Sequence, residues 1–316
     1  MSHARVSVVI ACHNAAPYIR ESVESALAQT VPPLEVVVVD DASTDESREI
    51  VESIPGVRLI AMPKSGVSRA RNEGFRSASG EFVVFHDADD RLLPTAVEVG
   101  LRAFAVHPEC GFVYGYARQI DGAGEPVPTT DPEPVEAGYA TLLAGSPPVP
   151  PSTVLFRREA IEAVGGFRTE REPVEDVDLF LRVGRSFPVH CHGERVTEYR
   201  RHGGNVSAVS PSRTLRAALS TLELQRPEVE GQPDLLAALN QGKRYFTRLF
   251  GRSVGFEMFG ALRAGDIRKA LAISPFAFRH APRGVLAALG HYFRRLPAVT
   301  RSLLFRRSGQ QPSRSS

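Results

Sequence analysis

Apolar, β-branched runs alternate with helix-like patterns along the first hundred residues of the chain. Four runs predict buried strands: Val6–Ala11, Val36–Val39, Val57–Ala61 and Glu81–Phe85. Between them, apolar residues at helical spacing predict helices over Pro17–Gln29 and Gly66–Ala78. Strands that alternate with helices of this length favour right-handed crossovers. The predicted fold class is therefore α/β, with a mostly parallel, Rossmann-like central sheet flanked by helices.

A further helix is expected between the second and third strands. Ser43 and Glu46 stand three positions apart, which is the spacing of a capping box. In such a box each side chain accepts a hydrogen bond from the other residue's backbone N–H. The spacing predicts a helix that opens at Ser43 and runs to Ser53.

The pattern loosens beyond the first hundred residues. Further strands are predicted at Phe112–Tyr116, Thr153–Phe156 and Val189–Tyr199, and helices at Arg158–Val164 and Glu175–Ser186. Loops are predicted at Asp121–Pro134 and over the proline-dense Ser146–Ser152. From Pro211 onward the sequence is rich in Ala, Leu and Arg and poor in strand patterns. We therefore expect one domain at 1–210 and a helical, basic C-terminal region at 211–316, with a disordered tail at 310–316.

Polar clusters follow three of the predicted strands. They are Cys12-His13-Asn14, Asp40-Asp41 and Asp87-Ala88-Asp89-Asp90. In open parallel sheets, ligands bind beyond the carboxyl ends of the strands. Paired carboxylates suit a hard divalent cation, which prefers oxygen ligands and often keeps phosphates in its shell. The alternative for the last cluster is a solvated turn, or a cap for a helix that begins near Pro94.

Six ordered motifs resemble family 2 glycosyltransferases with a GT-A fold. They are Val6–Asn14, Val38–Asp45, Ala70-Arg71-Asn72, Phe85–Asp90, the acidic Glu175–Leu179 and the basic–histidine Tyr199–His202. The resemblance extends from Val6 to Ser207, and the motifs come in the family order. One departure is His13, because the family often has a tyrosine before the asparagine. That departure bears on the contact with the base of the donor.

The resemblance implies an inverting transferase that uses a nucleoside-diphosphate sugar, with UDP expected. It implies Mn²⁺ or Mg²⁺ as cofactor, because a bound divalent cation offsets the charge that grows on the leaving diphosphate. Asp89 is implied as the direct metal ligand, and Asp87 as a carboxylate that faces the ribose or the metal. His202 is implied as a third metal ligand or a diphosphate contact, with a structural loop histidine as the alternative.

The same resemblance implies a set of donor-binding residues. The set is Ala11, His13, Asn14, Asp41, Arg71, Asp87 and Ala88. Asp41 would accept a hydrogen bond from the base, and Arg71 would contact the base or the diphosphate. For Arg71 the alternative is a solvated arginine on a helix face. Asp40 is expected to anchor the neighbouring loop, and Asp45 to lie at a helix start.

Asp176 is implied as the catalytic base, with Glu175 as its neighbour near the acceptor. Inversion in a single displacement needs a group that takes the proton of the acceptor hydroxyl. A carboxylate near a helix N-terminus tends to stay ionised at neutral pH, as a base must. The alternative is that Glu175, Asp176 and Asp178 only complement a helix dipole. Asp178 is expected to be structural in either case.

The formal net charge of +2 hides an uneven distribution along the chain. Residues 243–316 hold 15 Lys and Arg against two acidic residues, a net charge of +13, which leaves −11 for residues 1–242. Apolar residues also follow a helical stripe among the arginines: Val285, Leu286, Leu289, Tyr292, Phe293 and Leu296. A basic amphipathic helix of this kind binds anionic membranes, which predicts a membrane contact through 282–307. The alternative is a helix packed on the catalytic domain, with its arginines in solvent.

Several classes of protein are excluded or disfavoured. An apolar content of 42% and a charged content of 23% exclude disordered, collagen-like and coiled-coil chains. Without an apolar run of about 20 residues, and with three cysteines far apart, we expect a cytoplasmic protein, peripheral on the inner face of the membrane. A nucleotidyltransferase is the alternative enzyme, but Ala11–Tyr18 holds no Gly, Arg or Lys for a triphosphate loop.

A non-enzymatic anion-binding protein that uses the basic tail is the other alternative. It leaves the ordered acidic motifs unexplained, so no nucleic-acid partner is expected. The expected partners are a nucleotide-sugar donor and a hydroxyl acceptor, either a glycan or a lipid-linked glycan. The expected role is synthesis of a bacterial cell-surface polysaccharide or glycolipid.

Overall fold

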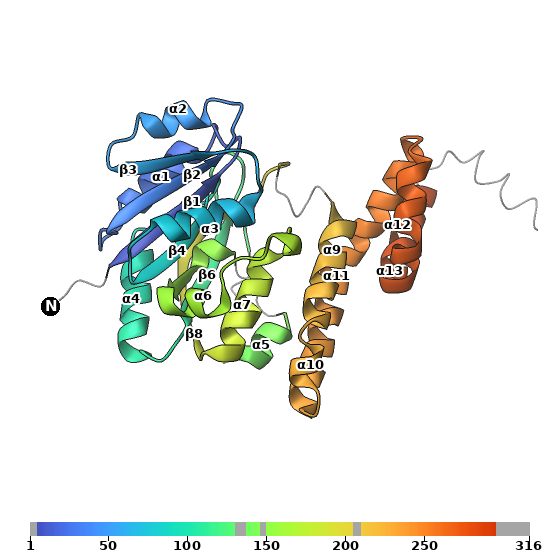
Figure 1. Cartoon of the computed structure of the whole chain (residues 1–316). Helices are drawn as coiled ribbons and strands as arrows, with labels where there is room; N and C mark the ends of the chain where they lie inside the picture. Colours follow the sequence, from blue (N-terminus) through green and yellow to red (C-terminus); the bar gives the residue numbers. More distant parts are fainter. Residues whose placement is uncertain (1–4, 130–136, 146–149, 205–209, 295–316) are drawn as a thin grey trace, which may run out of the picture. The chain divides into compact units, whose positions relative to one another are not determined.

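The computed structural model describes residues 5–129, 137–145, 150–204 and 210–294 of the chain. It divides the chain into two compact units (Figure 1). The first unit contains residues 1–209 and 217–243, and the second contains residues 210–216 and 244–316. The expected disordered tail at 310–316, the basic segment at 301–307 and Leu296 lie outside the described residues, as does most of the proline-dense loop.

An eight-stranded sheet forms the centre of the first unit, in the order β3-β2-β1-β4-β7-β6-β8-β5 (Figure 1). The strands are β1 (Val6–Cys12), β2 (Glu35–Asp41), β3 (Val57–Met62), β4 (Phe82–Asp87), β5 (Arg91–Leu92), β6 (Phe112–Ile120), β7 (Val154–Arg157) and β8 (Val189–Arg200). β1 to β4 run parallel to one another, as their apolar runs predict. β7 is antiparallel to both β4 and β6, whereas β6 and β8 are parallel. The α/β class with a central sheet is therefore confirmed.

Helices cover both faces of this sheet. They are α1 (Ile19–Leu27), α2 (Ser47–Glu52), α3 (Val67–Ser77), α4 (Ala96–Val106), α5 (Tyr139–Leu143), α6 (Arg158–Val164) and α7 (Glu175–Ser186). Successive strand residues point to opposite faces, so Val8 and Ile10 join the core beneath α1 and α4. Val37 and Val39 pack with Ala70 of α3 on the other face. β1, β2 and β4 are thus buried on both faces, as their continuous apolar runs indicate.

The capping box predicted at Ser43 does not form. The helix begins at Ser47, four residues later, and Ser43 Oγ accepts a hydrogen bond from Asn14 N at 3.0 Å. Asp45 lies at the helix start instead, where its carboxylate accepts from Ser47 N at 3.1 Å and from Ala16 N at 3.0 Å. Ser43 therefore ties the loop after β2 to the loop after β1, a tertiary contact that local spacing does not reveal.

The remaining described residues form helices, as predicted from Pro211 onward. They are α9 (Pro211–Glu223), α10 (Arg226–Val229), α11 (Pro233–Arg263), α12 (Ile267–His280) and α13 (Pro282–Arg294). In the second unit, α11 and α13 approach closely, because a Cβ added at Gly284 would lie 1.9 Å from the Gly251 carbonyl oxygen. Asp266 caps α12 by accepting from Lys269 N at 3.0 Å. Among the described residues, no helix combines the length and apolar content that crossing a bilayer requires.

Candidate active site

The sheet brings the three polar clusters to one edge. In the strand registers Ala11 pairs with Asp87, and Cys12 pairs with Asp40. The clusters after β1, β2 and β4 therefore lie side by side at the carboxyl ends of adjacent parallel strands, where ligands of such sheets bind. This is the arrangement that the sequence predicts for a donor site.

Asn14 fastens the first two of these loops together. Its backbone is left-handed, with φ of 52°, and its Oδ1 accepts a hydrogen bond from Thr44 N at 2.8 Å. His13 beside it is exposed, and Ala11 is partly exposed at the end of β1. Asp40 accepts from Ser43 N at 3.2 Å, so it anchors the loop as expected. The predicted base-side residues thus stand on a loop that hydrogen bonds tie to the loop after β2.

Asp41 is buried and already has several partners. Its carboxylate accepts from Ser65 N at 2.6 Å and Gly66 N at 3.0 Å, and it pairs with Lys64 Nζ at 3.0 Å. Burial alone would raise its pKa, but Lys64 and the backbone N–H groups outweigh burial and hold the pKa below its ordinary value. Asp41 is therefore an anion held in place at the carboxyl end of β2. Its contact with the base of the donor stays a prediction.

Arg71 joins the two acidic motifs of the chain. Its Nη2 lies 2.6 Å from Asp87 Oδ1, and its Nη1 lies 2.7 Å from Glu175 Oε1. The residue is only 4% exposed, so it is not a solvated arginine on a helix face. Burial would lower its pKa, but Asp87 and Glu175 raise it, so the guanidinium stays charged. One buried cation therefore holds the end of β4 and the start of α7 together.

Asp89 and His202 meet across 113 positions of sequence. His202 Nε2 lies 2.8 Å from Asp89 Oδ2, which brings together two of the three predicted metal ligands. Burial and the neighbouring Asp87 raise the pKa of Asp89, and the same causes, with Asp89 itself, raise that of Asp90 well above normal. Burial and the proximity of the three carboxylates thus disfavour the ionised forms of Asp89 and Asp90, and a bound cation would favour them.

The Asp89 carboxylate and the His202 imidazole fit a divalent cation that also keeps ligands from outside the protein. Carboxylate oxygen and imidazole nitrogen suit Mn²⁺, and carboxylate oxygen suits Mg²⁺. Within the part of the chain that the structure describes, no three His, Cys, Asp or Glu side chains form a ready metal cluster. Asp87 is turned to Arg71. Asp89 and His202 would therefore hold a metal whose other ligands come from phosphate and water, as such ions usually keep.

Asp176 lies in the first turn of α7, where its Oδ1 accepts from Val177 N at 2.7 Å. We expected the helix N-terminus to keep its pKa low, and that expectation is wrong. Burial raises the pKa of Asp176 to about 7, and the adjacent Glu175 adds to the rise. A pKa close to the working pH suits a general base better than a strongly acidic carboxyl group does.

The other two acids of this motif have distinct surroundings. Glu175 is buried and bound to Arg71, and its place near an acceptor stays a prediction. Asp178 is fully buried and accepts from Arg182 Nε at 2.7 Å, which makes it structural, as expected. All three carboxylates lie in the first turn of α7, but Glu175 and Asp178 are each paired with an arginine.

Two contributors to this site are absent from the sequence prediction. Glu172, which precedes α7, accepts a hydrogen bond from Ser68 N at 2.9 Å and so caps the first turn of α3. Lys64 neutralises Asp41. Neither has a local signal, because Glu172 and Ser68 are separated by 104 positions and Lys64 stands in an irregular loop.

Solved structures share this fold. S. aureus TarS in complex with UDP-GlcNAc superimposes with a TM-score of 0.57 at 20% identity, covering 85% of this chain and 90% of that one. Mannosyltransferase PcManGT from Pyrobaculum calidifontis, in complex with GDP-Man and Mn²⁺, gives a TM-score of 0.58 at 21% identity, covering 91% and 79%. At these identities the likeness shows the fold alone, which is of the GT-A type.

Curated relatives are glycosyltransferases of glycan synthesis. Chondroitin synthase of Pasteurella multocida is 31% identical over 184 residues, which are 56% of this chain but 18% of that protein. The chain therefore spans only a small part of that relative's length. The Escherichia coli UDP-Glc:alpha-D-GlcNAc-diphosphoundecaprenol beta-1,3-glucosyltransferase WfaP is 27% identical over 207 residues, 64% of this chain and 80% of that one. The model of the family described as glycosyl transferase family 2 matches residues 7–165, half of the chain, and the protein therefore belongs to glycosyl transferase family 2.

Proposed function

We propose that this glycosyltransferase moves a sugar from a UDP-sugar to a hydroxyl acceptor with inversion at the anomeric carbon. The observation that carries the proposal is the double ion pair of Arg71, with Asp87 at 2.6 Å and Glu175 at 2.7 Å. It ties the acidic motif expected at the donor diphosphate to the motif that holds the proposed base. A single displacement needs both ends of the reaction in one site.

The donor nucleotide is assigned to the edge formed by β1, β2 and β4. Asp41 accepts a hydrogen bond from the base, while Ala11, His13 and Asn14 line that side of the donor. Ala88 and Asp87 lie at the ribose and diphosphate. Support for uridine comes from the UDP-GlcNAc bound by TarS and the UDP-Glc named as the donor of WfaP. Arg71 serves this site by holding Asp87, because both of its terminal nitrogens are engaged with carboxylates.

Mn²⁺ or Mg²⁺ is the proposed cofactor, held by Asp89 and His202, with Asp87 beside them. The bound ion would act as a Lewis acid for the charge on the departing diphosphate. The raised pKa of Asp89 and its 2.8 Å contact with His202 support the assignment. The Mn²⁺ bound by PcManGT supports the choice of metal class.

Asp176 is the proposed base. As the acceptor oxygen bonds to the anomeric carbon, its proton passes to the Asp176 carboxylate, and the bond from that carbon to the diphosphate oxygen breaks. A raised pKa of about 7 lets this carboxylate hold the proton after transfer. Glu175 is the proposed neighbour at the acceptor, and its ion pair with Arg71 fixes the start of α7.

The C-terminal region is proposed to bring the catalytic unit to a lipid-linked acceptor on the inner face of the membrane. In the second unit, large apolar side chains are exposed on three helices: Leu249, Leu262, Ile267, Leu271, Phe278, Leu286 and Leu289. Arginines accompany them, and residues 243–316 carry a net charge of +13. An exposed apolar surface with excess positive charge complements anionic lipid. WfaP, which acts on a diphosphoundecaprenol-linked sugar, supports this class of acceptor.

Calorimetric titration of UDP tests the donor and metal assignments together. We expect binding in the presence of Mn²⁺ and its loss when EDTA is added. Binding of GDP but not UDP would overturn the choice of base while leaving the class of enzyme intact. After a donor sugar is identified, the NMR coupling constant of the product's anomeric proton will show whether the configuration is inverted.

A further inference from the structure

Arg200 is the largest fully buried side chain in the described parts of the chain, and the proposed chemistry does not yet use it. It is the last residue of β8, two positions before His202. A guanidinium is costly to bury unless its donors are paired, so the partners of Arg200 show what the fold gains from it.

Arg200 donates two hydrogen bonds to the loop that carries Asp89. Its Nε donates to the Asp89 carbonyl oxygen at 2.8 Å, and its backbone N–H donates to Asp90 Oδ1 at 2.9 Å. Two successive residues of the acidic loop are thus held by one residue of β8. The backbone of Asp89 is fixed relative to the strand that leads to His202.

Tyr18 links the same guanidinium to His202. The guanidinium carbon lies 4.8 Å from the centroid of the Tyr18 ring, and that ring lies 4.9 Å from the ring of His202. His202 in turn contacts Asp89 at 2.8 Å. The contacts therefore form a closed circuit of Arg200, Asp89, His202 and Tyr18, in which Arg200 reaches both sides of the proposed metal site.

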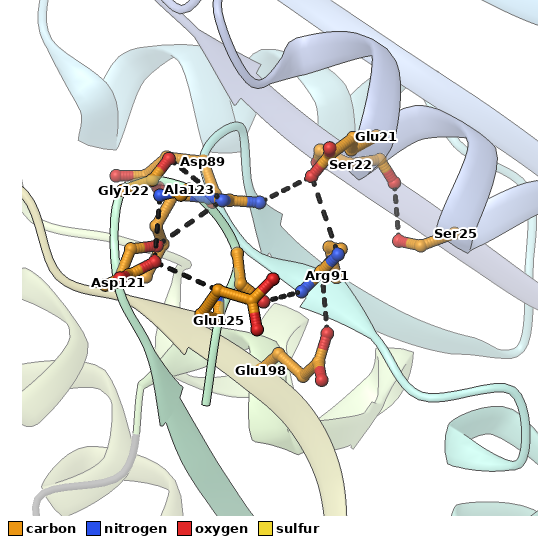
Figure 2. Close-up of polar contacts among 12 residues, drawn as sticks. Glu21, Ser22, Ser25, Asp89, Arg91, Asp121, Gly122, Ala123, Glu125 and Glu198 are labelled. Carbon is orange, nitrogen blue, oxygen red and sulfur yellow. Dashed lines mark hydrogen bonds and ion pairs between the residues drawn. The ribbon is translucent and has the colours of Figure 1, made fainter. Parts of the chain in front are cut away.

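Glu21 on α1 orients this guanidinium. Its Oε2 lies 2.6 Å from Arg200 Nη2 and 3.8 Å from Arg91 Nη1. Figure 2 shows Glu21 above Arg91, which also pairs with Glu198, and the turn at Asp121 and Gly122 to one side. The carbonyl oxygens of Asp121 and Gly122 lie 3.5 and 3.4 Å from Arg200 Nη1. Glu21 is exposed, with 48% of its side chain accessible, so it can be changed without opening the core.

We propose that Arg200 is a positioning residue that sets the distance between Asp89 and His202, and that Glu21 holds it in the required orientation. The inference rests on the proposed function, because it takes Asp89 and His202 as the metal ligands. Residues that orient metal ligands typically change metal affinity by about 10- to 100-fold when they are replaced. A merely structural ion pair between α1 and β8 would change stability and leave metal affinity unaltered.

Glu21→Gln is the main test, because it removes the charge that orients Arg200 but keeps the size of the side chain. Glu24→Gln is the matched control: Glu24 is also on α1, is 57% exposed and pairs with Arg20 at 3.4 Å. The readout is Mn²⁺ affinity in the presence of UDP, measured by electron paramagnetic resonance without any sugar transfer. We expect Glu21→Gln to weaken Mn²⁺ binding about tenfold, and Glu24→Gln to match the wild type.

Activity supplies a second readout that a structural role would not move. Glu21→Gln should raise the Mn²⁺ concentration for half-maximal rate, while kcat at saturating Mn²⁺ stays near that of the wild type. Arg200→Lys keeps the charge but loses the planar fork, so it should weaken Mn²⁺ binding at least as much. Wild-type Mn²⁺ affinity in Glu21→Gln would overturn the inference and leave the proposed function standing. A wild-type protein that binds no nucleotide with Mn²⁺ would overturn the proposed function, and the inference with it.

Discussion

Asp176 can accept a proton only while it is ionised, and its surroundings set the pH at which that happens. Burial and Glu175 raise its pKa to about 7, so the protonated, inactive form accumulates as the pH falls below that value. We expect kcat to fall about tenfold for each unit below the pKa and to level off above it. A pH–rate profile at saturating donor and acceptor checks this. A profile that is flat down to pH 5 would remove Asp176 from the role of base.

Replacement of the same residue separates catalysis from binding. Asp176→Asn keeps the shape of the side chain but cannot accept the proton, so transfer should fall about a hundredfold or more. UDP affinity should stay close to wild type, because Asp176 lies on the acceptor side of the proposed site. Calorimetry of UDP beside a rate assay measures both quantities. Loss of UDP binding together with activity would make the residue structural.

Asp89 is the residue on which the metal assignment depends most. Asp89→Ala removes a carboxylate that lies 2.8 Å from His202, and we expect it to abolish metal-dependent UDP binding and transfer. Asp234→Ala, at an exposed position in the first turn of α11, is the control for loss of one acidic charge. Near-normal turnover in Asp89→Ala would exclude the metal role. Thermal unfolding of both variants separates a lost ligand from a lost fold.

At the scale of single residues, the sequence predicted one contact of the candidate site but not the ion pairs around it. The meeting of Asp89 with His202 was expected because both stand in motifs of the family. The ion pairs of Arg71 and the grip of Arg200 on Asp89 were not expected, because their partners lie 16 to 111 positions away and leave no local pattern. Asp176 shows the same limit, since its raised pKa comes from burial, which spacing alone does not reveal.

Helix α3 is packed closely against the strands that end at the proposed donor site. A Cβ added at Gly74 would lie 2.3 Å from Val9 Cγ1 and 3.1 Å from Val39 Cγ2. Alanine favours a helix interior over glycine by about 1 kcal/mol, but overpacking costs about 1–3 kcal/mol. At a contact this short the clash should win, so we expect Gly74→Ala to lower the free energy of unfolding.

Denaturant unfolding measures that change, with Gly138→Ala as the control. A Cβ at Gly138 meets nothing within 4 Å, and its φ of 176° is extended backbone that alanine adopts freely. We expect a change within about 0.5 kcal/mol there, as at other open positions. A Gly74→Ala protein as stable as the wild type would show that α3 can move away from the sheet at little cost.

At the scale of elements, strands β1, β2 and β4 were predictable because parallel strands buried on both faces read as continuous apolar runs. The edge strand β3 is only partly buried, but its apolar residues still predicted a strand. The two-residue strand β5 was not predictable, because Arg91–Leu92 is too short to show a period. The start of α2 was misplaced for a different reason. Ser43 has the spacing of a cap, but Asn14 competes for its hydroxyl and Asp45 serves the helix start instead.

At the scale of the whole molecule, composition and contacts divide the chain at different places, whereas the change of charge at residue 243 lies next to the contact boundary at 243/244. The sequence suggests a boundary at 210, where helical composition begins. In the structure, residues 217–243 belong with the first unit, because α9 and α11 each extend through both units. We propose that the first unit carries the catalytic site and that the basic second unit binds the membrane. Composition detects the change of helical content, whereas the path of the chain depends on tertiary packing.

Two of the three helices of the proposed membrane surface, α12 and α13, each expose one apolar stripe and bury another. On α12, Ile267, Leu271 and Phe278 stand at i, i+4 and i+11 and are exposed, while Ile273 and Ala277 on the other side are buried. On α13, Leu286 and Leu289 are exposed, while Val285 and Ala288 are buried. Arg268, Arg279 and Arg283 accompany the exposed stripes. Each basic residue near an anionic surface contributes about 1 kcal/mol to binding, and salt screens this attraction.

Sedimentation with lipid vesicles tests this surface. We expect the full chain to sediment with phosphatidylglycerol vesicles at low salt, to bind phosphatidylcholine vesicles weakly, and to be released when residues 282–316 are removed. The double variant Leu271→Ser with Phe278→Ser should weaken sedimentation without deleting any segment, because it removes apolar area that would enter the interface. Leu34→Ser with Val106→Ser, which changes exposed apolar residues of the first unit, is the matched control and should sediment like the wild type. Wild-type sedimentation of both the truncated chain and the α12 variant would show that the exposed stripes do not bind the vesicles. Failure of the full chain to sediment would overturn the membrane proposal, and the acceptor would then have to reach the catalytic unit without a shared membrane surface.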